Sequence, residues 1–198
     1  GIYSNARKVK YMSKANKSNK AIKYRLYPND EQKVMFAKTF GCCRFVYNQL
    51  LALQKQRYKD GESHLSKLKS NEFATRTLKK DYDFLKEIDK FAVSNAVFHL
   101  ADAYDRFFKK QNHFPKFKSK RKSKKSYTTN FTNNNILIGK NVIKLPKVGM
   151  VKAVIHRLPK DDWKLKSVTV SQDSVGNYFA SVLFEYEQED IPSVSKSR

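Results

Sequence analysis

The chain has 198 residues, and its 41 Lys and Arg against 18 Asp and Glu give a formal charge of +23 at pH 7. This length suffices for one ordinary hydrophobic core or for two compact units, and such a charge favours a polyanionic partner, with nucleic acid as the first candidate and a membrane surface as the competitor. No stretch approaches the roughly 18 apolar residues of a membrane-spanning helix, which argues against a membrane protein.

The chain begins with a basic segment and one strand. Residues 1–19 are basic and polar without the apolar run of a secretory signal. We therefore expect a disordered tail, and the lack of an export signal suggests a location in the cytoplasm or at a nucleoid. Ile22, Tyr24 and Leu26 then alternate with basic residues, and Pro28 follows. This period of two predicts a strand over 20–28.

Residues 29–112 carry helical patterns. Asn29 is an N-cap signal with Gln32 three residues later, and Gly41 is a stop signal, which predicts a helix over 29–41. Apolar positions from 42 onwards predict a second helix that ends at Gly61, so that the two form a helical hairpin. A third helix is expected near 66–80. The clearest pattern lies in 89–111, where apolar residues recur every three or four positions.

Residues 113–134 form a basic and Asn-rich connector, within the stretch "FPKFKSKRKSKKSYTTNFTNNN". It holds seven Lys or Arg between positions 116 and 125, followed by Thr and Asn. Lys and Arg bind phosphates, Asn and Thr can contact base edges, and the two Phe residues can stack on unpaired bases. The residues alone leave three functions open: a solvated flexible segment, a localisation signal, or the wall of a nucleic-acid groove.

Residues 135–190 contain short stretches rich in β-forming residues, including "NILIG", "VIKLP" and "MVKAVIH", and a hairpin around 174–177. The N-terminal strand would be unstable alone and has no partner among the helices, so we expect it to join this sheet. The predicted fold class is therefore α+β, with the helices inserted into a β-barrel or curled sheet.

No arrangement of catalytic residues emerges from the sequence. Asp102 and Asp105 share a helix face, where a solvated surface beside basic residues is the ordinary explanation. Asp161 and Asp162 fall in a predicted turn, where Asp is favoured for backbone reasons. The four histidines are scattered, and the only two cysteines are adjacent, a spacing that seldom chelates one ion or forms a disulfide. We predict no catalytic site and no metal site.

Six segments, in order, resemble the N-terminal half of TnpB, also called OrfB, the transposon-encoded family of RNA-guided DNA endonucleases that is ancestral to type V CRISPR effectors. They are "AIKYRLYPNDEQ", "GCCRFVYNQLLA", "DKFAVSNAVFHLADAYDRFF", "FPKFKSKRKSKKSYTTNFTNNNILIG", "IKLPKVGMVK" and "KSVTVSQDSVGNYFASVLFEYE". The resemblance implies a wedge-type β-barrel, made of the N-terminal strand and the C-terminal strands, with an inserted helical recognition domain of helix-turn-helix type over 29–112. It also implies two partners, a guide RNA from the transposon end and double-stranded target DNA, and no membrane.

The resemblance further implies particular contacts. Lys90, Thr132 and Asn133 match residues that contact the transposon-adjacent motif. Ser94 stands where a relative carries Gln, so its motif preference is expected to differ. Lys67 and Ser70 fall where the family also approaches DNA. The candidates for phosphate contacts are four residues of the connector: Lys116, Lys118, Lys120 and Arg121.

The family's RuvC-like nuclease domain is expected to begin where this sequence stops, and residues 191–198 form a tail leading to it. The resemblance therefore implies no cofactor in this chain, because Mg²⁺, with Zn²⁺ as a further candidate, belongs to that domain. Without metal ligands we expect no nuclease activity from the chain alone.

Three hypotheses of function follow. The first is the nucleic-acid-binding portion of a transposon-encoded RNA-guided DNA endonuclease, which binds guide RNA and recognises a short transposon-adjacent DNA motif. The second is a stand-alone DNA-binding regulator of transposon ends that does not cleave. The third is a general RNA-binding protein that relies on its charge alone.

Overall fold

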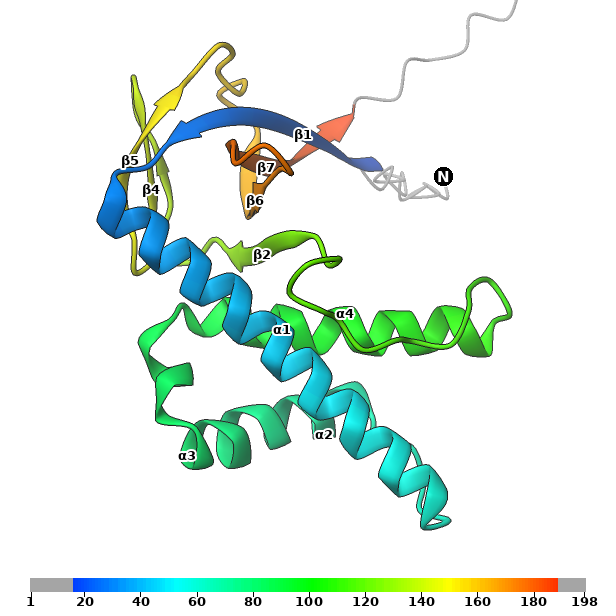
Figure 1. Cartoon of the computed structure of the whole chain (residues 1–198). Helices are drawn as coiled ribbons and strands as arrows, with labels where there is room; N and C mark the ends of the chain where they lie inside the picture. Colours follow the sequence, from blue (N-terminus) through cyan, green and yellow to red (C-terminus); the bar gives the residue numbers. More distant parts are fainter. Residues whose placement is uncertain (1–15, 189–198) are drawn as a thin grey trace, which may run out of the picture.

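The computed structural model describes residues 16–188. The fold is α+β, with a curled seven-stranded sheet on one side and the helices on the other (Figure 1). The elements in chain order are β1 (Asn16–Tyr27), α1 (Asp30–Lys59), α2 (Lys67–Glu72), the π-helix η1 (Phe73–Leu78), α3 (Lys79–Asp81), the 3-10 helix η2 (Asp83–Glu87), α4 (Lys90–Phe108), β2 (Lys125–Asn130), β3 (Leu137–Ile138), β4 (Val142–Leu145), β5 (Gly149–Val154), β6 (Lys164–Gln172) and β7 (Tyr178–Gln188).

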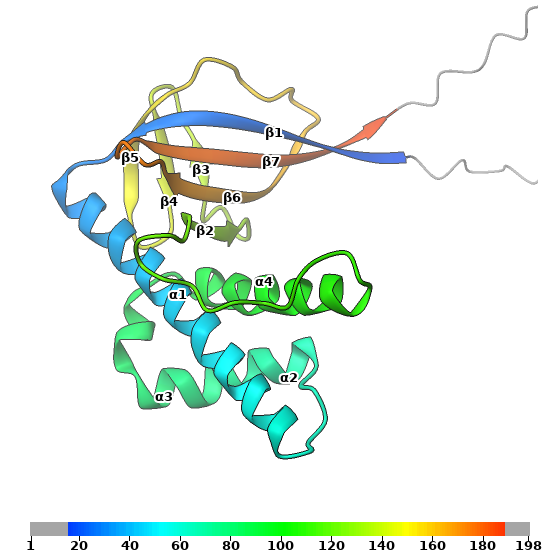
Figure 2. The same ribbon diagram turned by 45° about the vertical axis from the view of Figure 1, so that its right-hand side comes forward.

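The N-terminal strand joins the C-terminal strands, as predicted. The strand order is β2-β6-β7-β1-β5-β4-β3, and every neighbouring pair is antiparallel. β1 pairs with β7 from Asn16, opposite Gln188, to Leu26, opposite Tyr178. The helices lie in sequence between β1 and β2. The sheet curls into a half-barrel whose two edges are β2 and β3 (Figure 2).

The prediction of a helical hairpin over 29–61 is wrong. Residues 30–59 form one continuous helix, α1, which passes through Gly41. Glycine in a helix interior costs about 1 kcal/mol relative to alanine, but the side chains on both sides of Gly41, those of Phe40 and Cys42, are buried in the core. Packing of this face outweighs the weak stop signal. The N-cap prediction is confirmed, because Asn29 and Gln32 form a reciprocal capping box.

The other two helical predictions are confirmed. The stretch near 66–80 is one helical run that begins at the N-cap Ser66 and passes through a π-helix before α3. The strongest periodic segment forms α4, which is capped by Asp89 and ends at Phe108.

Two segments differ from their predicted form. Residues 125–130 were expected in a connector but form β2, whose alternate residues Tyr127 and Thr129 are buried. Because the residues around them are Lys, Ser and Thr, the sequence shows no alternation of apolar and polar residues that would predict a strand. Residues 16–19, expected in a disordered tail, belong to β1. The rest of that tail and the predicted C-terminal tail lie outside the described residues.

The helices and the sheet share one core. Phe36 of α1 packs against Tyr178 of β7 and Tyr127 of β2, with ring centroids 5.6 and 6.3 Å apart. Phe40, one turn later, also contacts Tyr127 at 5.8 Å. These aromatic contacts fix α1 against the sheet, and α1 in turn carries the residues that hold the connector.

We expect Phe36→Ala to lower the free energy of unfolding by about 3 to 5 kcal/mol, because the ring is fully buried at the junction of helix and sheet. Urea unfolding followed by circular dichroism measures the change. The matched control is Val34→Ala on the same helix, since Val34 is 68% exposed and its loss should stay within about 0.5 kcal/mol. Similar losses for both variants would contradict this account of the core.

Candidate nucleic-acid interface

The basic connector is fixed along the helices rather than loose. After α4 it runs back along that helix towards β2, as both ribbon views show (Figures 1 and 2). The amide of Asn48 on α1 donates to the Lys118 carbonyl and accepts from the Lys118 N–H, both at 2.8 Å. Such a paired amide contact holds the connector backbone at a defined place on α1.

A second anchor lies near the start of the connector. The Lys55 ammonium lies over the rings of Phe117 and Phe114, 4.5 and 5.6 Å from their centroids. Pro115 between these rings is buried. Cation–π contacts of this kind are worth about 0.5–1 kcal/mol each at exposed sites. The flexible-segment explanation of the connector therefore does not fit its contacts.

The connector forms a ridge of positive charge that no carboxylate neutralises. Its seven basic residues all have exposed surface, and none forms a salt bridge with any acidic residue between positions 16 and 188. Three of the predicted phosphate contacts, Lys116, Lys120 and Arg121, belong to this free set. Unpaired exposed cations held on a rigid backbone are what phosphate groups require.

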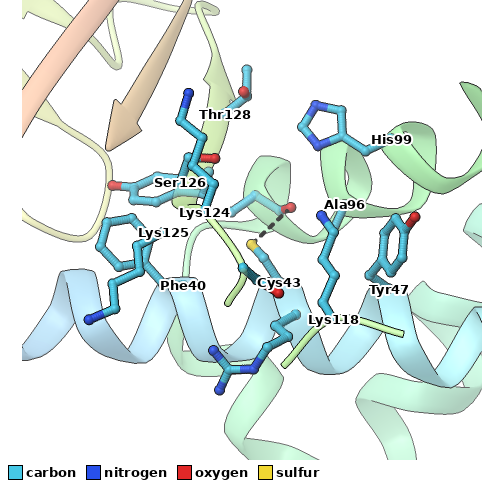
Figure 3. Close-up of a pocket in the computed structure, with 14 residues that line it drawn as sticks. Phe40, Cys43, Tyr47, Ala96, His99, Lys118, Lys124, Lys125, Ser126 and Thr128 are labelled. Atoms are coloured by element: carbon cyan, nitrogen blue, oxygen red, sulfur yellow. Dashed lines mark hydrogen bonds between the residues drawn. The ribbon is translucent and has the colours of Figure 1, made fainter. Parts of the chain in front are cut away.

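The fourth predicted phosphate contact, Lys118, is placed differently. Its ammonium lies 4.1 Å from the centre of the Tyr47 ring, and burial lowers the pKa of Lys118 below its ordinary value. Figure 3 shows this side chain between Cys43 and Tyr47, with its end directed towards α4. Lys118 thus turns inward while its neighbours on the ridge stay in solvent.

The ammonium of Lys118 enters a small pocket of about 40 Å³ between α1, α4 and the connector. Arg44, His99, Lys124 and Lys125 also line it, whereas no acidic residue does among these described side chains. Cys43 cannot supply a nucleophile, because burial raises the pKa of its thiol to about 12 and its Sγ donates to the Ala92 carbonyl at 3.4 Å. The pocket is therefore lined by cations and lacks a nucleophile that is ready to react.

A tight turn follows β2 and presents two of the predicted DNA-contacting residues. The Asn135 N–H donates to the Thr132 carbonyl at 3.1 Å, and the Thr132 N–H donates to Asn135 Oδ1 at 2.8 Å. Asn133 and Asn134 between them have φ of 47° and 55°, a left-handed conformation that Asn tolerates well. The Thr132 and Asn133 side chains are exposed and make no hydrogen bond within residues 16–188.

Asn95 of α4 ties this turn to the helix. Its Nδ2 donates to the Thr128 carbonyl at 2.9 Å and to Asn130 Oδ1 at 2.7 Å. Asn135 Nδ2 donates to the Asn130 carbonyl at 2.8 Å, so a chain of amides runs from α4 through β2 to the turn. Sequence reasoning missed Asn95. The available signal was a polar amide among the mainly apolar residues of this helix, which could have marked it as a half-buried hydrogen-bond donor.

The N-terminal end of α4 adds further lysines. Lys90 is exposed directly after the cap Asp89, whose carboxylate accepts from the Phe91 N–H at 3.0 Å. Burial raises the pKa of Asp89, and the nearby charges of Lys90 and Lys147 oppose that rise. Burial, followed by the charge of Lys90, lowers the pKa of Lys79. Lysines from α3, from α4 and from the turn between β4 and β5 therefore lie near this end of α4.

The remaining predicted residues lie beside α4. Ser94 is half-buried on α4 next to Asn95. Lys67 of α2 places its ammonium 4.4 Å from the centre of the Phe98 ring on α4. Ser70 is only 5% exposed, so its side chain acts in the packing of α2 against α4. The fold thus arranges Lys90, Ser94 and Lys67 along α4, with the 132–135 turn tied to it through Asn95.

The described part of the chain contains no cluster of three or more His, Cys, Asp or Glu side chains that could hold a metal ion. Within the same residues, the helices are all too short or too polar to cross a membrane.

We expect Asn48→Ala to release the connector, because both hydrogen bonds to the Lys118 backbone are lost. Each is worth about 1 kcal/mol, so local opening and tryptic cleavage between 116 and 125 should rise about fivefold or more. Limited proteolysis with mass spectrometry locates the first cuts. Gln56→Ala is the matched control on α1, since Gln56 bonds only to the nearby Asp60 carboxylate. Equal cleavage of both variants would contradict the anchoring role.

Comparison with known proteins gives a consistent set of relatives. The profile of the OrfB helix-turn-helix domain matches residues 16–63, which in this structure form β1, the single helix α1 and the loop after it. A candidate RNA-guided DNA endonuclease of Streptomyces pristinaespiralis is 31% identical over 168 residues, 84% of this chain. The candidate RNA-guided DNA endonuclease InsQ of Escherichia coli is 30% identical over 174 residues, also 84% of this chain.

These matches differ in how much of each relative they span. The chain covers 41% and 40% of the two endonuclease relatives. The virulence protein VsdF of Salmonella dublin is 32% identical over 111 residues, which are 51% of this chain and 93% of that protein. The chain is therefore similar to about two fifths of the longer relatives and to nearly all of the shorter one.

Proposed function

The chain belongs to the TnpB/OrfB family and resembles its N-terminal part, and on that premise we propose that it is the nucleic-acid-binding portion of a transposon-encoded RNA-guided DNA endonuclease. In this role it binds a guide RNA from the transposon end and recognises a short transposon-adjacent motif in double-stranded DNA, at the nucleoid. The curled sheet corresponds to the family's wedge-type barrel, and the helices between β1 and β2 correspond to its recognition domain.

The observation that carries this proposal is the ridge of unpaired cations beside an Asn-rich turn. Lys116, Lys120 and Arg121 hold phosphates, because their charges are exposed, free of ion pairs and carried on an anchored backbone. Thr132 and Asn133 are free to bond to base edges, since neither side chain has a partner within residues 16–188. Asn amides make bidentate contacts with adenine in the major groove.

The lysines at the start of α4 complete the proposed DNA contact. Lys90 is exposed at the helix N-terminus, where the unpaired N–H groups and the helix dipole also attract phosphate. Ser94 lies farther along α4, and Lys67 of α2 places its ammonium over Phe98 of α4, so both would follow the same strand. Ser70 supports this surface from within, because it is buried between the two helices.

Base recognition by Asn133 is tested by Asn133→Gly, which removes the amide while glycine keeps the left-handed backbone that alanine would strain. We expect discrimination between motif and scrambled DNA to fall by about 1 to 3 kcal/mol. Competition binding with duplexes that differ only in the motif measures it. Asn134→Gly is the matched control, because that residue has the same backbone conformation.

Lys120→Ala should weaken binding to all sequences alike and reduce the slope of log K against log salt by about 1. If instead Asn133→Gly and Lys120→Ala changed motif discrimination equally, Asn133 would have no role in base recognition.

We further propose that metal-dependent cleavage belongs to the portion of the endonuclease relatives that this chain does not span. Two-metal phosphodiester cleavage needs several carboxylates around the metal ions, with Mg²⁺ as the expected metal and Zn²⁺ as a further candidate. We expect the chain with Mg²⁺ and RNA to leave supercoiled plasmid DNA intact over hours. Gel electrophoresis detects nicking, and cleavage that chelation by EDTA abolishes would refute the proposal.

A second candidate is a stand-alone DNA-binding regulator of transposon ends that does not cleave. The match to VsdF favours it. That match spans 93% of VsdF but only 51% of this chain, so a protein can consist of little more than the matching part. Sequencing of RNA that co-purifies with the chain separates the two functions. Enrichment of a transposon-end RNA supports the first, and sequence-specific duplex binding that survives RNase treatment, without such an RNA, supports the second.

A further inference from the structure

An aromatic groove lies at the far end of the helices from the Asn-rich turn. It has a volume of about 690 Å³ and lies where the C-terminal ends of α1 and α4 meet the start of the connector. Its aromatic lining consists of Tyr58, His64, Tyr104, Phe107, Phe108 and Phe114. Neither the predicted DNA contacts nor the pocket beside Lys118 includes any of these residues.

The rings of this groove hold one another in fixed positions. Phe114 meets Phe107 and Tyr104 edge to face, with centroids 5.1 and 5.5 Å apart. His64 contacts Tyr104 at 4.5 Å and Phe108 at 5.4 Å in the same edge-on manner. Tyr104 is buried and serves as the base of the cluster. The groove is therefore formed before any ligand enters.

Two of the rings keep much of their surface in solvent despite these contacts. Phe108 is 58% exposed and Tyr58 is 87% exposed. Large exposed apolar patches are rare on monomeric soluble proteins and mark interaction sites. A purely structural role explains Tyr104, but it leaves the exposure of Tyr58 and Phe108 without a reason.

The charge around the groove selects the kind of partner. Lys55 and Lys59 line it, and the basic ridge begins directly after Phe117. Glu62, the one acidic lining residue in this described region, is already paired with Arg57 at 2.8 Å. Aromatic rings bordered by lysines that form no salt bridge within residues 16–188 match a chain of unpaired bases with a phosphate backbone. An apolar protein surface would gain nothing from these cations.

We propose that the aromatic groove binds unpaired nucleotides of a single-stranded RNA segment. One or two bases stack on Phe108 and Tyr58, and their phosphates contact Lys55 and Lys59. The groove volume falls within the range of about 300–1,000 Å³ that is usual for ligand sites. This inference rests on the proposed function, because it assigns part of the RNA to a specific surface at the end of the connector.

The test uses the double variant Tyr58→Ala/Phe108→Ala, which removes the two most exposed rings of the groove and leaves buried Tyr104 in place. We expect its affinity for a single-stranded RNA oligonucleotide to fall about tenfold or more, because each stacked base contributes substantially to binding. Affinity for a blunt-ended RNA duplex should stay unchanged, and so should the salt dependence. Fluorescence anisotropy at several salt concentrations measures all three.

Tyr27→Ala is the matched control, since Tyr27 is a 48% exposed aromatic residue on β1, outside the groove. Circular dichroism spectra and thermal unfolding establish that each variant is folded. Lys59→Ala gives a separate readout, because losing a phosphate contact should lower the salt slope for single-stranded RNA.

Wild-type binding to single-stranded RNA that the double variant retains in full would overturn the inference and leave the proposed function standing. If the wild-type chain bound no RNA of either form, both would fail. Self-association that the double variant abolishes, with unchanged RNA affinity, would assign the groove to a second copy of the chain and also overturn the inference.

Discussion

The long antiparallel pairing of β1 with β7 is the constraint on which the rest of the molecule depends. It joins the first and last described segments of the chain, from Asn16 opposite Gln188 to Leu26 opposite Tyr178. Since α1 begins only three residues after β1, its direction is set by that strand and then fixed by Phe36 against Tyr178. Asn48 and Lys55, farther along α1, place the connector. The basic ridge is therefore positioned by the sheet through α1, and the ridge itself runs into the sheet at Lys125, the first residue of β2.

The distribution of charge explains how a chain with a formal charge of +23 holds an unneutralised ridge. The salt bridges found between residues 16 and 188 lie elsewhere, as in the pairs Arg57–Glu62 and Lys17–Glu185. The ridge is left to repel itself in solvent, where water and salt screen it. Lys118 alone turns inward, and Tyr47 offsets part of its desolvation. A polyanion that binds the ridge would neutralise this repulsion. The electrostatic free energy of the ridge is therefore higher in the unbound chain than in the complex.

Much of the fold could be predicted because its signals are local or follow from simple pairing rules. The capping box at Asn29, the periodicity of α4 and the need of β1 for a partner all act over short distances or exclude alternatives. The predicted break at Gly41 was wrong, because the low helix propensity of glycine is a weak local preference. Burial of the neighbouring side chains outweighs it. The β2 strand was missed because its two buried residues are hidden among Lys, Thr and Asn. The amide of Asn95 and the inward turn of Lys118 depend on segments distant in sequence, which no local pattern encodes.

The two ends of α4 carry different kinds of chemistry, and the distance between them constrains any ligand that uses both. The helix has 19 residues, which at 1.5 Å per residue span about 28 Å. The N-terminal end offers directional amides and lysines suited to a duplex, whereas the C-terminal end offers stacking rings suited to unpaired bases. At 3.4 Å per nucleotide along a strand, the intervening ridge faces about eight phosphates. A nucleic acid that changes from paired to unpaired within that length fits the surface better than a uniform duplex or a uniform single strand. On the two proposals above, the connector sets the spacing between the two binding surfaces, because its anchors on α1 hold it at a fixed length.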